Sequence, residues 1–188
     1  FSSLEMSFTD AFFEAMSGLT TTGSTVFSGL DELPKGLLLW RGILQWLGGI
    51  GIVVVAMVFL PELRVGGMQI FRTESFDTFG KILPRATEIA SRISGIYVSL
   101  TMACAVAYVL AGMDAFDATV HAMTTIATGG FSNYDSSFAA FGPGACYVAT
   151  VFMILAALPF VRFVQLSAGT ARPLLQDTQI HAFLGTAT

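Results

Sequence analysis

Three long runs of this chain contain no charged residue, and they limit its possible folds more than any other feature. They cover residues 42–60, 93–113 and 142–161. A membrane-spanning helix needs roughly 20 mainly apolar residues, so each run is long enough to cross a bilayer. Of the 188 residues, 54% are hydrophobic and 12% are charged, whereas a typical soluble domain has about 25% charged residues. We therefore expect an all-α membrane protein surrounded by the lipid bilayer.

The second constraint is an internal repeat, because two similar segments lie 107 residues apart. The first ends in Thr-Thr-Thr-Gly-Ser at 20–24, and the second ends in Ala-Thr-Gly-Gly-Phe-Ser at 127–132. The match extends upstream, where Asp10 aligns with Asp117. In each copy a polar stretch and then a long apolar run follow. Self-similarity at a fixed spacing indicates one structural unit per copy.

Each copy predicts a re-entrant pore helix followed by an extended filter strand. The segment 7–19 is too short to cross a bilayer, and non-helical backbone occurs at membrane depth only inside protein or beside a water-filled cavity. Backbone carbonyls in such a strand can replace the water that a cation loses, and glycine adopts backbone angles that other residues resist. One copy alone could be a helix that stops at a glycine. The repetition favours the pore loop.

Basic residues set the orientation that we expect in the membrane. Five of the nine lie in the connector 61–92, and none lies between positions 112 and 143. Short loops rich in Lys and Arg stay in the cytoplasm, so the connector and the C-terminal tail should face inward. Both pore loops then enter from outside. Lys35 and Arg41 fall on the outer side and count against this orientation.

We expect the chain to divide into four segments. These are a pore loop and outgoing helix of one repeat (1–60), the cytoplasmic connector (61–92), a complete second repeat of helix, pore loop and helix (93–166), and a cytoplasmic tail leading to another repeat (167–188). The chain starts without an initiator Met and ends within a segment, so it is interpreted as an internal fragment. Pro159 predicts a kink near the end of the last apolar run.

Several polar residues near the loops have two interpretations each. His121 aligns with Glu14 inside a pore helix, where it could brace the filter or sense pH. Acidic residues at the outer mouth could attract cations or be ordinary solvated loop charges. These are Asp31, Glu32 and Asp135. Asp10 and Asp117 are interpreted as favourable charges at helix N-termini.

Gly48, Gly49 and Gly51 interrupt the first apolar run. Their spacing resembles that of a dinucleotide-binding turn, but no strand precedes them. Small residues that allow close helix contact are the favoured interpretation. A glycine hinge is the alternative.

Four stretches carry a resemblance to a known family. They are Phe-Thr-Asp-Ala-Phe-Phe-Glu-Ala-Met-Ser-Gly-Leu-Thr-Thr-Thr-Gly-Ser at 8–24, Gln-Trp-Leu-Gly-Gly-Ile-Gly-Ile at 45–52, Gly-Gly-Met at 66–68, and Ala-Met-Thr-Thr-Ile-Ala-Thr-Gly-Gly-Phe-Ser-Asn-Tyr at 122–134. Together they resemble the Trk/Ktr/HKT superfamily of potassium transporters, most closely the Trk-type membrane subunit of bacteria. In that family four helix–pore-loop–helix repeats surround one ion path, and each repeat contributes a filter strand with a central glycine.

The resemblance implies specific roles for residues in both loops. Gly23 and Gly130 correspond to central filter glycines, and the carbonyl donors to K⁺ would be Thr20, Thr21, Thr22, Ala127, Thr128 and Gly129. It also implies a multi-pass protein of the bacterial inner membrane, a homodimer when full length, and a cytoplasmic nucleotide-binding regulatory subunit as partner. The family's cytoplasmic-side gate has no counterpart, since Arg162 lies in the wrong repeat for its arginine.

The function predicted from these features is potassium-selective ion conduction, with K⁺ as the transported ion and no organic cofactor. A sodium or ammonium transporter and a non-transport membrane domain are the alternatives. An intramembrane enzyme is disfavoured because His121 has no evident nucleophile or metal-ligand partner in the sequence. No basic cluster indicates nucleic acid binding.

Overall fold

All regular structure in the described part of the chain is helical. The computed structural model describes residues 6–59, 86–167, 169 and 177–187. Its α-helices are α1 (Phe8–Leu19), α2 (Lys35–Phe59), α4 (Ala86–Leu110), α5 (Ala115–Ile126), α6 (Pro143–Ala157), α7 (Phe160–Ser167) and α9 (Thr178–Ala187), with 3-10 turns η1 (Leu30–Glu32) and η3 (Ser137–Ala140). These ranges include no β-strand, which agrees with the predicted all-α class.

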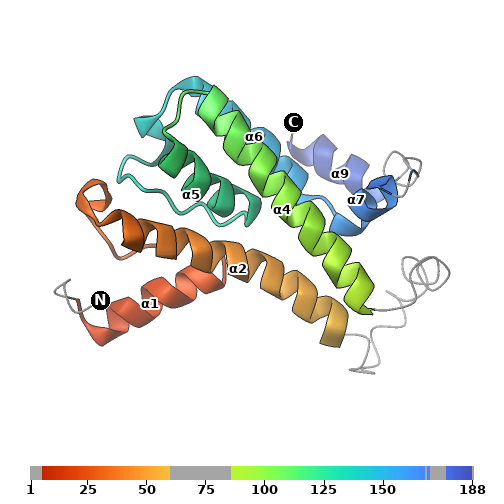
Figure 1. Ribbon diagram of the computed structural model, residues 1–188, viewed down its shortest axis with the longest axis horizontal. Helices are drawn as coiled ribbons and strands as arrows, with labels where there is room; N and C mark the ends of the chain where they lie inside the picture. The colour runs from red at the N-terminus through yellow and green to blue at the C-terminus, as the bar shows by residue number, and fades with distance from the viewer. Residues whose placement is uncertain (1–5, 60–85, 168, 170–176, 188) are drawn as a thin grey trace.

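The helices pack in two groups that share α2. Helix α1 lies along α2, and α5 lies between α2 and α4, with α6 packed on both α4 and α5 (Figure 1). Helix α7 follows α6 and packs against α4. As a result α5 is covered by three long helices, whereas α1 leaves large side chains such as Phe8 and Phe12 exposed.

Helices α1 and α5 occupy the two repeated segments and have the short length that the repeat predicts. Each contains 12 residues, which corresponds to about 18 Å against roughly 30 Å of hydrocarbon in a bilayer. Both begin with an N-cap side chain that accepts a backbone hydrogen bond, from Asp10 N–H to Ser7 in α1 and from Phe116 N–H to Asp114 in α5. Such caps provide an acceptor for one of the first backbone N–H groups of a helix, which have no acceptor within the helix itself.

The two longest helices begin earlier than the uncharged runs predict. Helices α2 and α4 contain 25 residues each, and both start seven residues before the predicted positions 42 and 93. Within α4, Ala90–Leu110 is long and apolar enough to cross a membrane. Helix α4 ends at Leu110 because Gly112 takes a left-handed φ of 98° and Met113 N–H bonds back to the Tyr108 carbonyl, a common way to stop a helix.

The third predicted span is not one continuous helix. Residues 142–161 were expected to cross the membrane with a kink, but α6 stops at Ala157 and α7 leaves at 87°. Pro159 causes this break, since proline lacks an N–H and pushes the preceding residue out of the helical region. Leu158 accordingly has an extended backbone with ψ 149°. The predicted kink is confirmed, as a break of 87° between two helices.

The predicted connector and tail are covered only in part. Residues 60–85 of the connector lie outside the described residues, and positions 86–92 belong to α4 rather than to a connector. The predicted tail contains α9.

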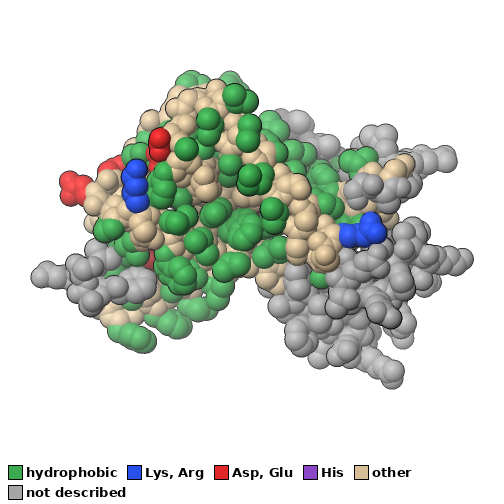
Figure 2. Space-filling view, in the orientation of Figure 1, with side chains coloured by type: hydrophobic (Ala, Val, Ile, Leu, Met, Phe, Trp, Pro, Cys, Tyr) green, Lys and Arg blue, Asp and Glu red, His purple; other side chains and the backbone are tan. Residues whose placement is uncertain are grey.

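Hydrophobic side chains cover most of the described face in Figure 2, and its few charged side chains lie toward the two ends. Leu110 is 83% exposed and Tyr147 is 74% exposed. A soluble protein seldom leaves so much large apolar surface uncovered. This distribution fits a protein that lies in a bilayer.

Of the three α2 glycines at positions 48, 49 and 51, two allow close contact with the loops. A Cβ on Gly48 would overlap the carbonyl oxygen of Leu19, the last residue of α1. A Cβ on Gly49 would come within 2.6 Å of the Tyr97 hydroxyl and 3.0 Å of Ala127 Cα. Gly51 has no atom of the described residues near its Cβ position. The packing interpretation therefore holds for Gly48 and Gly49.

These contacts predict opposite effects for two equivalent substitutions in the full-length protein. Gly48→Ala should lower the free energy of unfolding by about 1–3 kcal/mol, because an extra methyl in a packed contact forces the backbone to shift. Gly51→Ala should be neutral or stabilising, since alanine favours a helix over glycine. The melting temperature of the purified protein measures both. Equal melting temperatures would contradict the close contact at Gly48.

Candidate functional site: two facing loops

The first loop folds back onto the end of its own helix. The N–H groups of Thr22 and Gly23 both bond to the carbonyl of Ser17, at 3.0 and 3.4 Å, and Thr21 N–H bonds to the Gly18 carbonyl at 3.0 Å. Thr20 N–H still makes a helical bond to Met16. The end of α1 therefore fixes the path of the whole Thr-Thr-Thr-Gly segment.

The second loop repeats this pattern at the same spacing of 107 residues. Gly129 and Gly130 N–H bond to the carbonyl of Thr124 at 3.0 and 3.4 Å, and Thr128 N–H bonds to the Thr125 carbonyl at 3.0 Å. Ala127 N–H bonds to Met123. The sequence repeat is thus a repeat of backbone conformation.

Both loops take left-handed backbone angles at the same two positions. Thr21 and Thr128 have φ of 56° and 53°, and Gly23 and Gly130 have φ of 78° and 77°. Glycine adopts such angles easily, but they are rare for a β-branched residue. Strained conformations of this kind persist where the surrounding structure enforces them, commonly at functional sites.

The two loops touch each other next to Gly23. A Cβ added at Gly23 would overlap the carbonyl oxygen of Gly129. Gly130 differs, because no atom of the described residues lies within 4 Å of its Cβ position. The structure thus brings together the two segments that contain all eight sequence-predicted site residues, and gives the two central glycines different surroundings.

Helices α1 and α5 each brace the loop that follows them with the side chain at one repeat-equivalent position. Glu14 accepts hydrogen bonds from the Thr25 hydroxyl at 2.9 and 3.0 Å and from Val26 N–H at 3.0 Å. His121 contacts the Ser132 hydroxyl through Nε2 at 3.0 Å. Thr25 and Ser132 are themselves 107 residues apart. The same brace is therefore built twice with different chemistry.

The hydrogen bonds of His121 favour bracing over pH sensing. Its ring is completely buried, and Nδ1 lies 2.8 Å from the Asp117 carbonyl oxygen. Because a carbonyl can only accept, Nδ1 donates, and Nε2 of the neutral ring then accepts from Ser132. Both ring nitrogens are occupied in this arrangement.

Arg41 connects the two loops from α2. Its buried guanidinium donates from Nε to Glu14 at 2.7 Å, from Nη2 to Thr25 Oγ1 at 3.2 Å, and from Nη1 to the Ser132 carbonyl at 3.0 Å. It also lies 4.2 Å from the centre of the Phe131 ring. Sequence reasoning treated Arg41 only as a basic residue on the outer side. The missed signal was an arginine at the start of an apolar run, which is a candidate functional residue by default.

Two aspartates hold the polar loops in ways that the sequence did not predict. Asp117, in the first turn of α5, is buried and accepts from Asn133 Nδ2 and the Tyr134 hydroxyl, each at 2.8 Å. Asp135 accepts from the N–H groups of Gly29 and Leu30 at 2.7 and 3.0 Å. These bonds hold the pKa of Asp135 below its ordinary value. Asp135 therefore joins the loops, while Asp31 and Glu32 remain exposed in η1.

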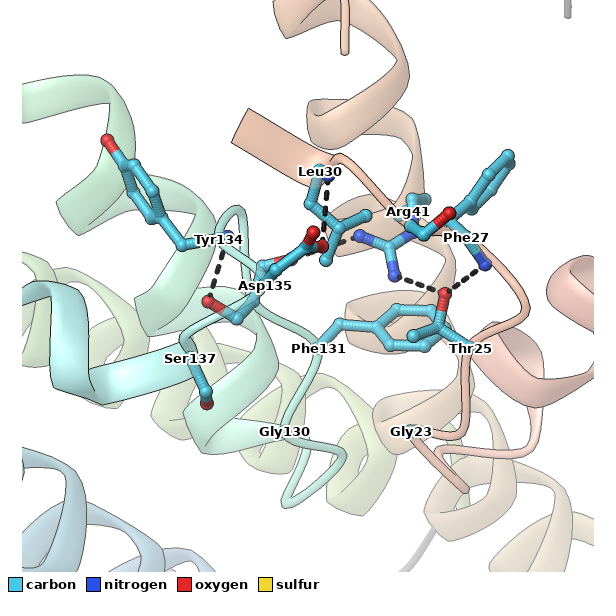
Figure 3. A pocket seen from close by; sticks show the side chains of 12 residues that line it. Gly23, Thr25, Phe27, Leu30, Arg41, Gly130, Phe131, Tyr134, Asp135 and Ser137 are labelled. Atoms are coloured by element: carbon cyan, nitrogen blue, oxygen red, sulfur yellow. Dashed lines mark hydrogen bonds between the residues drawn. The ribbon is translucent and has the colours of Figure 1, made fainter. Parts of the chain in front are cut away.

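An open cavity of about 380 Å³ lies over the two loops. Figure 3 shows Gly23 and Gly130 at its base, with Arg41 above them and hydrogen-bonded to Thr25. Asp135 also lines the cavity and lies beside Leu30. Residues of both loops, Gly23 and Gly130 among them, therefore line one cavity.

Comparison with known proteins places this arrangement in a family. The family model of TrkH, described as cation transport protein, matches residues 1–180. The Trk system potassium uptake protein TrkI of Halomonas elongata is 47% identical over 182 residues, covering 96% of this chain and 37% of that protein. The Trk system potassium uptake protein TrkH of Vibrio parahaemolyticus is 48% identical over 187 residues, covering 95% and 38%.

A solved structure agrees with these relatives. The crystal structure of the potassium transporter TrkH from Vibrio parahaemolyticus superimposes with a TM-score of 0.80 and 43% identity, covering 95% of this chain and 36% of that one. The chain thus spans under two fifths of the length of the relatives that it matches. It belongs to the TrkH family of cation transport proteins.

Proposed function

We propose that this chain supplies two of the four filter loops of a potassium-selective pore in a Trk-type uptake protein. One observation carries the proposal: two loops 107 residues apart share the same helix-end hydrogen bonds and the same left-handed positions. Two loops with the same strained backbone conformation, in contact with each other, fit the arrangement that a ring of carbonyl ligands requires. The names of the relatives, which are potassium uptake proteins, support potassium as the ion.

In the proposed filter, backbone carbonyls replace the water around K⁺. The donors are Thr20, Thr21 and Thr22 in the first loop, and Ala127, Thr128 and Gly129 in the second. Left-handed angles at every second residue, as at Thr21 and Gly23, turn successive carbonyls toward one side, whereas carbonyls alternate along an ordinary strand. Helices α1 and α5 end immediately before the loops, so the negative ends of their dipoles favour a cation there.

Two loops form half of the proposed ring, and other repeats of the full-length protein complete it. The division of the chain into a partial repeat, connector, complete repeat and tail fits that scheme. We propose a multi-pass protein of the bacterial inner membrane, dimeric when full length, with the connector available to a cytoplasmic nucleotide-binding regulatory subunit. The proposed role is conduction without catalysis. Sodium or ammonium conduction is the alternative, and measurements of uptake selectivity distinguish it from potassium conduction.

The filter assignment predicts that serine at either central glycine of the full-length protein changes selectivity. A residue with a Cβ at these left-handed angles carries strain of about 1–3 kcal/mol, and each 1.4 kcal/mol corresponds to a factor of ten. Gly23→Ser and Gly130→Ser should therefore lower the ratio of K⁺ to Na⁺ uptake roughly tenfold. Gly23→Ser should have the larger effect, because its Cβ also overlaps Gly129. Uptake of both ions, normalised to membrane protein, measures this.

Gly36→Ser is the matched control for these variants. Gly36 is exposed in the first turn of α2, and no atom of the described residues lies within 4 Å of its Cβ position. It should keep the normal ratio. If both filter variants also kept that ratio, the glycines would be helix stops only.

The proposed orientation predicts where single cysteines react in the intact protein. In a background without Cys104 and Cys146, a cysteine at Ser136 should react with an impermeant thiol reagent added outside. A cysteine at Arg72, in the basic connector, should react only from the cytoplasmic side. The opposite pattern would reverse the proposed topology.

A further inference from the structure

Helix α2 reaches across to the second loop with two polar side chains. Arg41 and Gln45 lie one turn apart, so they project from the same face of the helix. Arg41 donates to the Ser132 carbonyl at 3.0 Å, and Gln45 Oε1 accepts from Phe131 N–H at 3.1 Å. Phe131 and Ser132 directly follow Gly130. The outgoing helix of the first repeat therefore holds the backbone of the second filter loop.

The Gln45 amide also lies between the two loops. A Cβ on Gly129 would come within 2.5 Å of Gln45 Cδ, and a Cβ on Gly23 would lie 3.5 Å from Gln45 Nε2. Gln45 is completely buried, and Nε2 has no hydrogen-bond partner among the described residues. A buried donor without a partner lowers the free energy of unfolding relative to an apolar residue of the same shape. The unpaired Nε2 therefore offsets part of the stability gained from the bond that Oε1 accepts from Phe131 N–H.

The second repeat has no such pair on its outgoing helix. At the spacing of 107 residues, Arg41 and Gln45 correspond to Val148 and Phe152 in α6. Neither of these side chains can donate or accept a hydrogen bond. At these two equivalent positions, α2 therefore carries polar side chains and α6 carries apolar ones.

We propose that Arg41 and Gln45 are positioning residues that set the cation selectivity of the second filter loop. The inference rests on the proposed filter function. The discrimination of a carbonyl filter depends on the position and number of its ligands. Fixing Phe131 N–H and the Ser132 carbonyl limits how far Gly129 and Gly130 can move. Arg41 holds the loop through a planar guanidinium group. Its N–H groups point in fixed, separate directions that a lysine ammonium does not reproduce.

The test uses the full-length transporter and compares initial uptake rates and KM for K⁺ and Na⁺. Gln45→Met keeps the volume and removes the acceptor for Phe131 N–H. It should lower the ratio of K⁺ to Na⁺ uptake roughly five- to tenfold, the loss expected for one buried hydrogen bond. Phe152→Leu, at the corresponding position of α6, is the control and should leave the ratio unchanged. A purely structural loss would lower the uptake of both cations alike.

Arg41→Lys provides a second variant, because it keeps a positive charge beside Glu14 but loses the planar set of N–H donors. It should shift the ratio in the same direction, and it decides the question if Gln45→Met does not reach the membrane. Gly130→Ser is measured alongside. If Gly130→Ser changes the ratio and neither α2 variant does, the positioning role is wrong and the filter stands. If none of the three changes it, the filter assignment fails as well.

Discussion

Backbone polar groups that lose contact with water must find partners inside the protein, and the two loops depend on this constraint. Where a loop packs against the rest of the protein, its N–H groups need acceptors there. Here the carbonyls of Ser17 and Thr124 each accept two of them. Side chains bond to further backbone groups of the loops: Glu14 accepts from Val26 N–H, Gln45 accepts from Phe131 N–H, and Arg41 donates to the Ser132 carbonyl. The buried polar residues of this chain are concentrated around the loops for that reason.

The two repeats meet the same constraint with different charges. In the first, the brace is the carboxylate Glu14, and a buried charge of this kind requires a partner, which Arg41 provides at 2.7 Å. In the second, the brace is His121, whose hydrogen bonds fit a neutral ring, and the position corresponding to Arg41 is Val148. A neutral brace needs no counter-ion. The charged brace therefore occurs in the repeat that has an arginine partner, and the neutral brace occurs in the repeat that has none at the equivalent position.

The sequence was sufficient to predict features that depend on local pattern. Apolar runs and the spacing of Thr and Gly predicted the helices and the repeat. The start of α2 was misjudged because Arg41 was taken as the membrane boundary, although Glu14 neutralises it. The roles of Arg41 and Gln45 could not be predicted, since their partners Ser132 and Phe131 lie 91 and 86 residues away. A kink at Pro159 was predicted, but its angle of 87° was not, because the angle depends on packing.

The central claim is that the two loops hold a dehydrated cation, and anomalous scattering from thallium tests it most directly. Thallium(I) is close to K⁺ in size and charge. A crystal structure of the full-length protein grown with thallium should contain anomalous peaks within bonding distance of carbonyl oxygens in segments 20–23 and 127–130. The claim would be contradicted by peaks along the conduction path that avoid both segments.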